Sequence, residues 1–336
     1  MHGWLVIDKP VGPGSTDIVS KVKRALREGG YRKLKVGHGG TLDPLASGVL
    51  PVALGEATKL AGRMLDADKV YEFTISFGEE TDTLDAEGAV AATSDVRPTV
   101  EQVESVLERF IGEIEQVPPA YSALKVDGKR AYALARAGAE VALESRRVTV
   151  HSLCSSPERG GGPPAKPVVE GARRRSGGDV GPLHQPSAGP PPRSGEELEE
   201  ITLLARVSKG TYIRSLARDI AYALDSVGHV TMLRRQKAGP FTLESAISLD
   251  KMAELAKARQ LEQALLPLTA GLDDIPALPV TPDQAGLLRQ GRKLAGIAAK
   301  PGLHLATDKS VPVALVELSE GELRVVRGFN IRDEGV

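Results

Sequence analysis

The residues best suited to chemistry lie in the glycine-rich segment 37–48, with the sequence GHGGTLDPLASG. It holds one carboxylate, that of Asp43, and it contains too much glycine for a helix or a regular strand. The glycines permit positive φ and a close approach of the backbone to a ligand, whereas Pro44 keeps Asp43 out of helical geometry. The pattern predicts an acid held on a rigid loop and available for catalysis, or a turn in which Asp43 bonds to its own backbone.

The composition of the whole chain excludes several kinds of structural and binding site. The sequence has 336 residues, a single cysteine and six scattered histidines, so it offers no internal disulfide and no cysteine-based zinc site. No apolar run approaches the ~18 residues of a membrane span, and the N-terminus has no signal-like segment. The glycine-rich segment also lacks the spacing of a phosphate-binding P-loop. We therefore expect a cytoplasmic, metal-free protein of two domains, or of one large domain with an appendage.

The net charge of −1 hides an uneven distribution of charged residues. Acids dominate residues 70–116, and basic residues dominate 21–35 and 206–237. Lys and Arg are also interleaved with two tyrosines over 121–147. A local basic face is what a phosphate backbone requires, and interleaved aromatic residues suit base stacking. Such runs also occur on ordinary solvated helices and hairpins, so charge alone leaves both interpretations open.

Hydrophobic periodicity predicts an alternation of strands and helices around the glycine-rich segment. A strand over 3–9 comes before a helix capped by Ser15 or Thr16, and the apolar residues of 71–77 alternate as in a half-buried strand. The other expected strands are 48–55, 148–153, 199–208, 230–235 and 239–243, and the other expected helices are 57–65, 100–111, 215–224 and 249–265.

Two further segments differ from this pattern. Residues 156–197 are rich in Pro, Gly, Ser and Arg and contain almost no large apolar residue, which predicts a disordered insertion within a domain. Prolines at 276 and 279 mark a boundary, after which apolar runs punctuated by glycine predict a small β domain.

Six segments, taken in order, resemble the bacterial tRNA pseudouridine-55 synthases of the TruB type. They are LVIDKP at 5–10, the glycine-rich segment 37–48, LGEATK at 54–59, residues 66–71 with TDT at 81–83, YSALK at 121–125 and SKGTYIR at 208–214. The resemblance implies an enzyme that isomerises the T-loop uridine at position 55 of tRNA to pseudouridine without a cofactor. The N-glycosidic bond is broken and the base is rejoined through C5.

The resemblance assigns the central role to Asp43 and a second one to Tyr71. A carboxylate can stabilise or capture the sugar cation that forms as the base leaves, and Asp43 occupies the position of the family's nucleophile. Attack at the sugar C1′ and a glycal-like route both fit these residue types. Tyr71 is expected to stack on the flipped-out base and to move a proton in the final step, which takes hydrogen from C5. From residue type alone, Tyr71 would be a buried strand tyrosine.

The resemblance also implies supporting roles around these two residues. His38 would fill space left by rearranged RNA, although it could instead cap its own loop. Tyr212 and Leu233 would line the uracil pocket, and Arg214 would form an ion pair that keeps Asp43 ionised. On a strand, Tyr212 and Arg214 would point to the same face. Lys9 is expected to be structural or to lie near a phosphate.

The implied architecture is α+β, with a pseudouridine-synthase fold that has a central mixed, largely antiparallel sheet flanked by helices. A small C-terminal, β-rich, PUA-like domain is expected to follow. We expect a catalytic domain at 1–250, which includes an RNA-gripping excursion at 121–147 and the insertion at 156–197. A helical connector at 251–274 then leads to an RNA-binding domain at 275–336. The expected partner is the T-arm of tRNA, bound by a monomer without a membrane or an obligatory protein partner.

Three other functions compete with this interpretation. A non-catalytic RNA-binding module or RNA chaperone would not need Asp43, Tyr71 and Arg214 together. A guide-RNA-dependent synthase of the archaeal and eukaryotic type would need partner proteins, whereas residues 121–147 suit a stand-alone grip on a tRNA arm. A glycoside hydrolase would need a second acid beside Asp43 in a comparable loop, and the sequence offers none.

Overall fold

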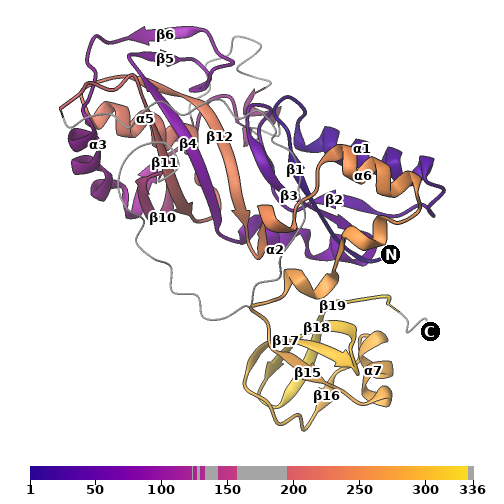
Figure 1. Cartoon of the computed structure of the whole chain (residues 1–336). Helices are drawn as coiled ribbons and strands as arrows, with labels where there is room; N and C mark the ends of the chain where they lie inside the picture. Colours follow the sequence, from indigo (N-terminus) through magenta and orange to yellow (C-terminus); the bar gives the residue numbers. More distant parts are fainter. Residues whose placement is uncertain (123, 127–128, 133–142, 157–194, 332–336) are drawn as a thin grey trace, which may run out of the picture. The chain divides into compact units, whose positions relative to one another are not determined.

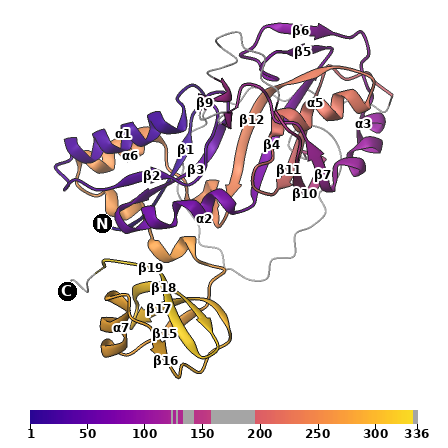
Figure 2. The ribbon, with the colours of Figure 1, turned by 180° about the vertical axis from the view of Figure 1, so that it is seen from behind.

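A computed structural model describes residues 1–122, 124–126, 129–132, 143–156 and 195–331. Contacts divide the chain into two compact units, Met1–Tyr71 with Leu233–Val336 and Glu72–Met232. Figures 1 and 2 show the ribbon from two sides. Most of the expected insertion, at 157–194, and residues 133–142 of the expected excursion lie outside the described residues.

The large sheet is mixed and largely antiparallel, as expected. In the first unit its strand order is β14-β1-β3-β12, and β3 pairs antiparallel with β1 and β2 but parallel with β12. The strands are β1 (Gly3–Lys9), β2 (Val36–His38), β3 (Ser47–Leu54), β12 (Gly228–Ala238), β13 (Phe241–Thr242) and β14 (Leu265–Pro267). The helices are α1 (Ser15–Glu28), α2 (Ala61–Asp66) and α6 (Leu249–Lys257), with 3-10 turns at Gly55–Leu60, Leu243–Ser245, Leu261–Ala264 and Leu268–Gly271.

Within the second unit the strand order is β12-β4-β11-β10-β7. Strand β10 pairs antiparallel with both β11 and β7, so the expected strands 148–153 and 199–208 are direct neighbours. The elements are β4 (Lys69–Phe77), β5 (Glu79–Thr81), β6 (Val90–Thr93), α3 (Val100–Leu107) with a 3-10 turn at Glu108–Phe110, β7 (Gly112–Gln116), β8 (Lys125–Val126), β9 (Lys129–Arg130), β10 (Arg146–Ser155), β11 (Glu200–Val207) and α5 (Ile213–Ala223).

A separate five-stranded sheet follows near the C-terminus, as the apolar runs predict. Its order is β15-β17-β18-β19-β16. It consists of β15 (Ala277–Pro279), β16 (Leu294–Ala295), β17 (Gly302–Asp308), β18 (Val311–Ser319) and β19 (Glu322–Gly328), with α7 (Pro282–Arg289). Its own apolar cluster includes Leu288, Val313 and Leu323.

The core of the first unit forms where the apolar faces of its elements meet. Helix α1 buries Ile18, Val19, Val22 and Leu26 on one face, and α1 and α6 lie side by side in both views. The indole of Trp4 is fully buried, and its Nε1 donates a hydrogen bond to the Leu268 carbonyl at 3.2 Å. These contacts form the base on which the glycine-rich segment lies.

Two local expectations near the glycine-rich segment are wrong. Its first residues do form a strand, because the backbone of β2 bonds to β3 and this pairing requires no side chain at Gly37. Gly14, not Ser15 or Thr16, is the residue that precedes α1, and the Asp17 carboxylate accepts a hydrogen bond from the Gly14 N–H at 3.0 Å. The hydroxyl of Ser15 is thereby available for another partner.

Three other elements differ from the expected limits. Helix α6 ends at Lys257 because Arg259 adopts a φ of +56° and the Gln260 N–H bonds back to the Leu255 carbonyl. The expected helical connector also contributes the edge strand β14. The segment at 57–65 starts as a 3-10 turn, in which the Thr58 hydroxyl bonds to the Gly55 carbonyl at 2.7 Å.

Strand β4 is covered on both faces and is not half-buried as expected. Glu72 and Thr74, on the face opposite Phe73, are 8% and 4% exposed. Each has a polar partner, since Ser156 donates to the Glu72 carboxylate at 2.7 Å and the hydroxyls of Thr74 and Thr202 lie 2.9 Å apart. Paired polar side chains are compatible with burial, and alternation of apolar residues alone does not reveal such pairs.

Candidate active site

The loop that carries Asp43 is held through four successive backbone carbonyls, those of residues 41–44. Arg235 Nη1 donates to Thr41 O at 3.2 Å, and the Ser15 hydroxyl donates to Leu42 O at 3.0 Å. Asp43 O accepts the Ala46 N–H at 3.1 Å, and Pro44 O accepts the Gly12 N–H at 2.9 Å. Because these donors come from β12, α1, Gly12 and the loop itself, the backbone around Asp43 is fixed.

The sequence around Asp43 favours this turn. Asp is common at the first position of a type I turn and Pro at the second, and the bond from Ala46 back to Asp43 closes the turn. The Ser15 hydroxyl bonds Leu42 twice, since it also accepts the Leu42 N–H at 2.7 Å. The Asp43 side chain is half-buried. A rigid backbone of this kind can hold a carboxylate in place for a reaction.

Lys9 holds the far side of the same turn. Its side chain is fully buried, and its Nζ donates to the carbonyls of Pro10 at 2.9 Å and Pro44 at 3.3 Å. These contacts join the end of β1 to the residue after Asp43 and support a positioning role for Lys9.

Arg235 lies beneath the loop and connects it to Tyr71. Arg235 is 1% exposed. Its Nε donates to Val49 O at 2.8 Å, and its Nη1, besides bonding Thr41 O, lies 3.4 Å from the Tyr71 hydroxyl oxygen. One side chain therefore contacts the loop, β3 and the half-buried Tyr71 at the start of β4.

The protein's own structure explains why two positions of the segment are glycine. A Cβ on Gly39 would lie 2.6 Å from Cβ of Met64, which is closer than real Cβ contacts. Gly40 has a φ of +137°, and a Cβ there would lie 3.4 Å from Arg235 Nη1. The backbone can therefore lie close to Met64 only because Gly39 has no side chain. Gly40 is required by its positive φ, since a Cβ there would make only an ordinary contact with the guanidinium.

The pKa of His38, the last residue of β2, is shifted in the direction that favours the neutral imidazole. Burial lowers its pKa from the ordinary 6.5, and the positive charge of Arg235 lowers it further, while a backbone contact with Gly40 acts in the opposite direction. Its Nδ1 is buried and has no hydrogen-bond partner among the described residues. Leu233 on β12 is 7% exposed and presents an apolar side chain in the same unit.

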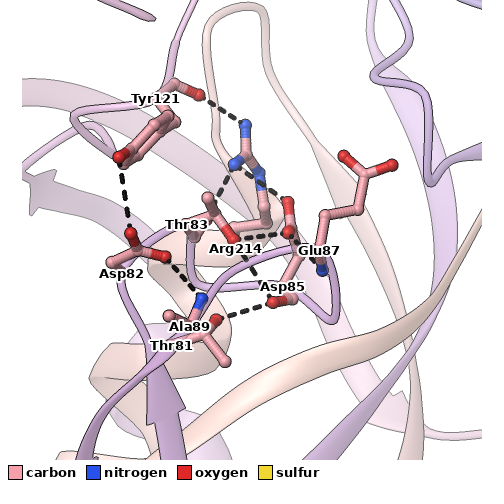
Figure 3. A network of polar contacts seen from close by, with 8 residues as sticks. All are labelled: Thr81, Asp82, Thr83, Asp85, Glu87, Ala89, Tyr121 and Arg214. Atoms are coloured by element: carbon pink, nitrogen blue, oxygen red, sulfur yellow. Dashed lines mark hydrogen bonds and ion pairs between the residues drawn. The ribbon is translucent and has the colours of Figure 1, made fainter. Parts of the chain in front are cut away.

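In the second unit, Arg214 belongs to a buried polar network (Figure 3). Its Nη1 bonds to the Asp85 carboxylate at 3.1 Å and to Thr83 O at 2.8 Å, and its Nη2 bonds to Tyr121 O at 2.9 Å. The side chains of Arg214 and Asp85 are only 6% and 4% exposed. The ion pair that the sequence predicts between Arg214 and Asp43 stays a prediction.

The Asp85 carboxylate is itself held in place by neighbouring residues. Its Oδ1 accepts from the Thr83 hydroxyl at 2.6 Å and from the Glu87 N–H at 3.1 Å, which leaves Oδ2 for Arg214. The Thr81 hydroxyl bonds to the Asp85 carbonyl at 2.6 Å. A buried carboxylate with these partners fixes the direction of the guanidinium.

Tyr212 and Arg214 do not lie on a strand, in contrast to the expectation. Tyr212 is the residue that precedes α5, and Arg214 lies in its first turn. The buried Gln116 side chain bonds to both the N–H and the carbonyl of Tyr212, at 2.8 and 3.1 Å. The guanidinium of Arg146 lies 4.7 Å from the centre of the Tyr212 ring. The placement of Tyr212 therefore comes from backbone bonds and a cation–π contact.

The basic residues of 206–237 do not form a single exposed face. Arg214 and Arg235 are buried, and Arg234 pairs with Asp8 while Arg218 pairs with Asp219. Arg234 and Arg235 are neighbours on β12, so they point to opposite faces of the sheet. The basic residues of 21–35, in contrast, are exposed. They are Lys21, Lys23, Arg24, Arg27, Arg32, Lys33 and Lys35.

Sequence reasoning missed three residues that position the candidate site. Asp85 was one of many acids in 70–116, Arg235 one of several basic residues in 206–237, and Gln116 carried no signal of its own. Their burial and partners distinguish them, and neither is visible in residue type. The spacing of Asp85, two residues after the TDT at 81–83, was the available indication for the first of them.

Comparison with known proteins agrees with this geometry. The sequence model for the N-terminal domain of TruB family pseudouridylate synthases matches residues 25–156, and that for the tRNA pseudouridylate synthase B C-terminal domain matches residues 214–273. The chain is 57% identical over 333 residues to tRNA pseudouridine synthase B of Novosphingobium aromaticivorans, covering 99% of both chains. It is 56% identical to the Zymomonas mobilis protein of the same name, covering 98% of this chain and 96% of that protein.

Solved structures show the same fold at lower identity. A Cbf5-Nop10-Gar1 complex contains a chain with a TM-score of 0.66 and 25% identity, over 98% of this chain and 86% of that one. A chain of an H/ACA RNP bound to a substrate RNA containing 2′-deoxyuridine has a TM-score of 0.65 and 23% identity, with the same coverage. Among the described helices, none has the length and apolar character needed to cross a membrane. With relatives this similar over nearly its whole length, the chain belongs to the TruB family of pseudouridylate synthases.

Proposed function

We propose that this chain converts the uridine at position 55 in the T-loop of tRNA to pseudouridine, with Asp43 as the nucleophile and no cofactor. The observation that carries the proposal is the fixed loop, in which the four carbonyls of residues 41–44 all accept hydrogen bonds. The names of its relatives, tRNA pseudouridine synthase B, support the substrate and the reaction.

The proposed chemistry uses one acid and no external reactant. As the N-glycosidic bond breaks, the Asp43 carboxylate stabilises or captures the positive charge that develops on the sugar. The uracil then turns, and its C5 bonds to C1′ as any bond between Asp43 and the sugar breaks. The proton on C5 is removed and N1, which has lost its bond to the sugar, takes up a proton, so the product is an isomer of the substrate. A carboxylate on a preformed backbone needs little rearrangement to act, which lowers the barrier.

The other candidate residues have supporting parts in this proposal. Tyr71 stacks on the extruded uracil and moves the proton from C5, while Tyr212 and Leu233 line the pocket around the base. Arg214, oriented by Asp85, is proposed as the ion-pair partner of Asp43. His38 stacks on a neighbouring nucleotide as a neutral ring, in agreement with its lowered pKa.

The exposed basic residues of 21–35 suit contact with the phosphates of a tRNA arm. We propose residues 1–250 as the catalytic domain and 275–336 as an RNA-binding PUA-like domain, with the protein acting in the cytoplasm as a monomer. Residues 121–147 are proposed to grip the T-arm, although 123, 127–128 and 133–142 lie outside the described part of the chain.

The test is chemical mapping of pseudouridine in an unmodified tRNA transcript incubated with the protein alone. We expect a single modified position, in the T-loop, and none in a transcript with cytidine at position 55. Asp43→Asn is expected to lower the rate at least about 1000-fold while the Kd for tRNA stays within about threefold, because the change removes charge but little volume.

Asp250→Asn, at an exposed acid in the first turn of α6, is the matched control and is expected to keep full activity. Full activity in Asp43→Asn would contradict the nucleophile assignment. An inactive wild-type protein that gains activity only with a guide RNA or partner proteins would contradict the stand-alone function.

A further inference from the structure

Arg235 is a buried cation that no part of the mechanism above uses. It is 1% exposed, and its hydrogen-bond partners are two backbone carbonyls, on the loop and on β3, and the Tyr71 phenol oxygen. Within the described residues no carboxylate forms an ion pair with it. A buried guanidinium with only neutral partners contributes little to folding stability, because its desolvation is costly. Its position beneath the site therefore suggests another role.

The contacts of Arg235 Nη1 link two groups that the proposed reaction needs in a fixed relation. This one nitrogen lies 3.2 Å from Thr41 O, two residues before Asp43, and 3.4 Å from Tyr71 Oη. The loop and the tyrosine come from different elements, separated by β3, α2 and the start of β4. The planar, rigid guanidinium holds these two partners through Nη1 while its Nε donates to Val49 O at 2.8 Å, whereas the single, flexible ammonium nitrogen of a lysine cannot reproduce this fork of Nε and Nη1.

The chemistry of the guanidinium also determines the direction of the tyrosine hydrogen. Arginine has only donors, so the Tyr71 oxygen must accept at this contact, and the Tyr71 O–H hydrogen points away from Arg235. The loop backbone at Gly40 also lies near the same guanidinium, since a Cβ built there would be 3.4 Å from Arg235 Nη1. Arg235 thus fixes the Tyr71 oxygen and the loop backbone from the buried side.

We propose that Arg235 is a positioning residue that sets the Tyr71 hydroxyl and the Asp43 loop relative to each other for the isomerisation. This inference rests on the proposed function, because it assigns Arg235 to the same reaction. The misplacement of a reacting group by about 1 Å can reduce a rate about 100-fold without loss of binding. The proposal therefore predicts a slower reaction and unchanged tRNA affinity when the fork is removed.

The adjacent Arg234 provides a matched control. It lies on the same strand but on the opposite face, is partly exposed, and pairs with Asp8 at 2.9 Å. Arg235→Lys and Arg234→Lys make the same chemical change at neighbouring positions. Both substitutions keep the positive charge. A difference in reaction rate between the two variants therefore reports the loss of the guanidinium fork at position 235.

The experiment measures single-turnover pseudouridine formation at saturating tRNA transcript, the Kd for tRNA, and the unfolding temperature of each variant. Arg235→Lys is expected to react about 10- to 100-fold more slowly with a Kd within about threefold of wild type. Arg234→Lys is expected to react within about twofold of wild type. A purely structural Arg235 would lower the unfolding temperature but leave the rate of the folded protein unchanged.

A second measurement tests the contact without relying on activity. In protein labelled with ¹³C at tyrosine Cζ, the Tyr71 resonance is identified by its loss in Tyr71→Phe. It is expected to shift in Arg235→Lys and to stay in place in Arg234→Lys. A Tyr71 resonance that does not move, or an Arg235→Lys rate within about twofold of wild type, would overturn the proposal. Failure of the proposed function would differ, since wild-type protein would then form no pseudouridine at all.

Discussion

The side chains around Asp43 differ in what they contribute. Ser15, Lys9 and Arg235 direct their polar groups at loop carbonyls and so restrain the backbone. His38 carries a buried Nδ1 without a protein partner among the described residues. The role of Ser15, Lys9 and Arg235 can be tested by substitutions that loosen the loop backbone. The role of His38 can be tested by measuring how the stability of the protein depends on pH.

Protonation of His38 should destabilise the folded protein. Burial, and then the charge of Arg235, lower its pKa below the ordinary 6.5 despite the opposing Gly40 contact. In the pH range between the folded and unfolded pKa values the unfolded state binds more protons. The contribution of neutral His38 is therefore complete above about 6.5 and is lost as the pH falls through that range. The unfolding temperature of wild type should fall more steeply between about pH 7.5 and 5.5 than that of His38→Gln.

The exposed His151 supplies the comparison, and His151→Gln should follow the wild-type curve. Parallel curves for wild type and His38→Gln would show that the imidazole titrates normally in the folded state.

Residue types alone predicted that Asp43 is a candidate catalytic acid on a rigid loop. The resemblance to a family supplied the expected roles of the other site residues. The supports of the loop could not be predicted in the same way. Arg235 looked like any other basic residue of 206–237, and only the fold shows that it is buried next to Thr41 O. Burial of a charged side chain depends on which strand face it occupies, and that requires the sheet register.

At the scale of elements, the first residue of α1 holds the loop that carries Asp43. Because Gly14 precedes the helix and Asp17 bonds to its N–H, the hydroxyl of Ser15 is free to hold both backbone groups of Leu42. The helix thereby anchors the residue before Asp43. Its exposed residues include four of the basic ones of 21–35, namely Lys21, Lys23, Arg24 and Arg27.

Ser15→Ala should weaken this anchor. The change leaves the N–H and carbonyl of Leu42 without their partner in a buried place, which should lower the free energy of unfolding by about 1–3 kcal/mol in urea titrations. The rate of pseudouridine formation should also fall about tenfold, because the backbone beside Asp43 is loosened. Ser20→Ala, at an exposed helix position with one bond to Thr16 O, should change the unfolding free energy by less than about 0.5 kcal/mol. Equal effects of the two changes would contradict the anchoring role.

The expected elements were largely correct in type, and each error has a physical cause. Ser15 is a strong helix-capping residue, but the Leu42 backbone competes for its hydroxyl. The period of apolar residues predicted a helix to residue 265, but the turn at Arg259 ends α6 early. The segment 37–48 looked too rich in glycine for a strand, yet residues 52–54 of β3 pair with β2. For Ser15 and for β2 a partner elsewhere in the chain overrides the local preference, whereas α6 ends through a turn of its own backbone.

At the scale of the whole chain, the C-terminal sheet is part of the first unit. Leu305, Leu315 and Phe329 belong to the same apolar cluster as Trp4 of β1. Polar contacts add to this, since Lys59 Nζ donates to Gly328 O at 2.8 Å and the Asn330 N–H donates to the Glu56 carboxylate at 2.8 Å. The C-terminal residues therefore share a core with Trp4 and Met64, which lie next to Gly39 of the glycine-rich segment.

This shared core predicts that the first unit unfolds together with the C-terminal sheet. Phe329 is 1% exposed, and Phe329→Ala should cost about 3–5 kcal/mol through lost burial and a cavity. Calorimetry should show the whole first unit unfolding at a lower temperature in this variant, not the C-terminal sheet alone. Val326→Ala, at a residue 56% exposed, should leave the transition in place. If Phe329→Ala produced a separate early transition and left the unfolding of the remaining chain unchanged, the C-terminal sheet would be an independent domain. In that case the large sheet and its helices would stabilise the Asp43 loop, and the C-terminal sheet would not contribute.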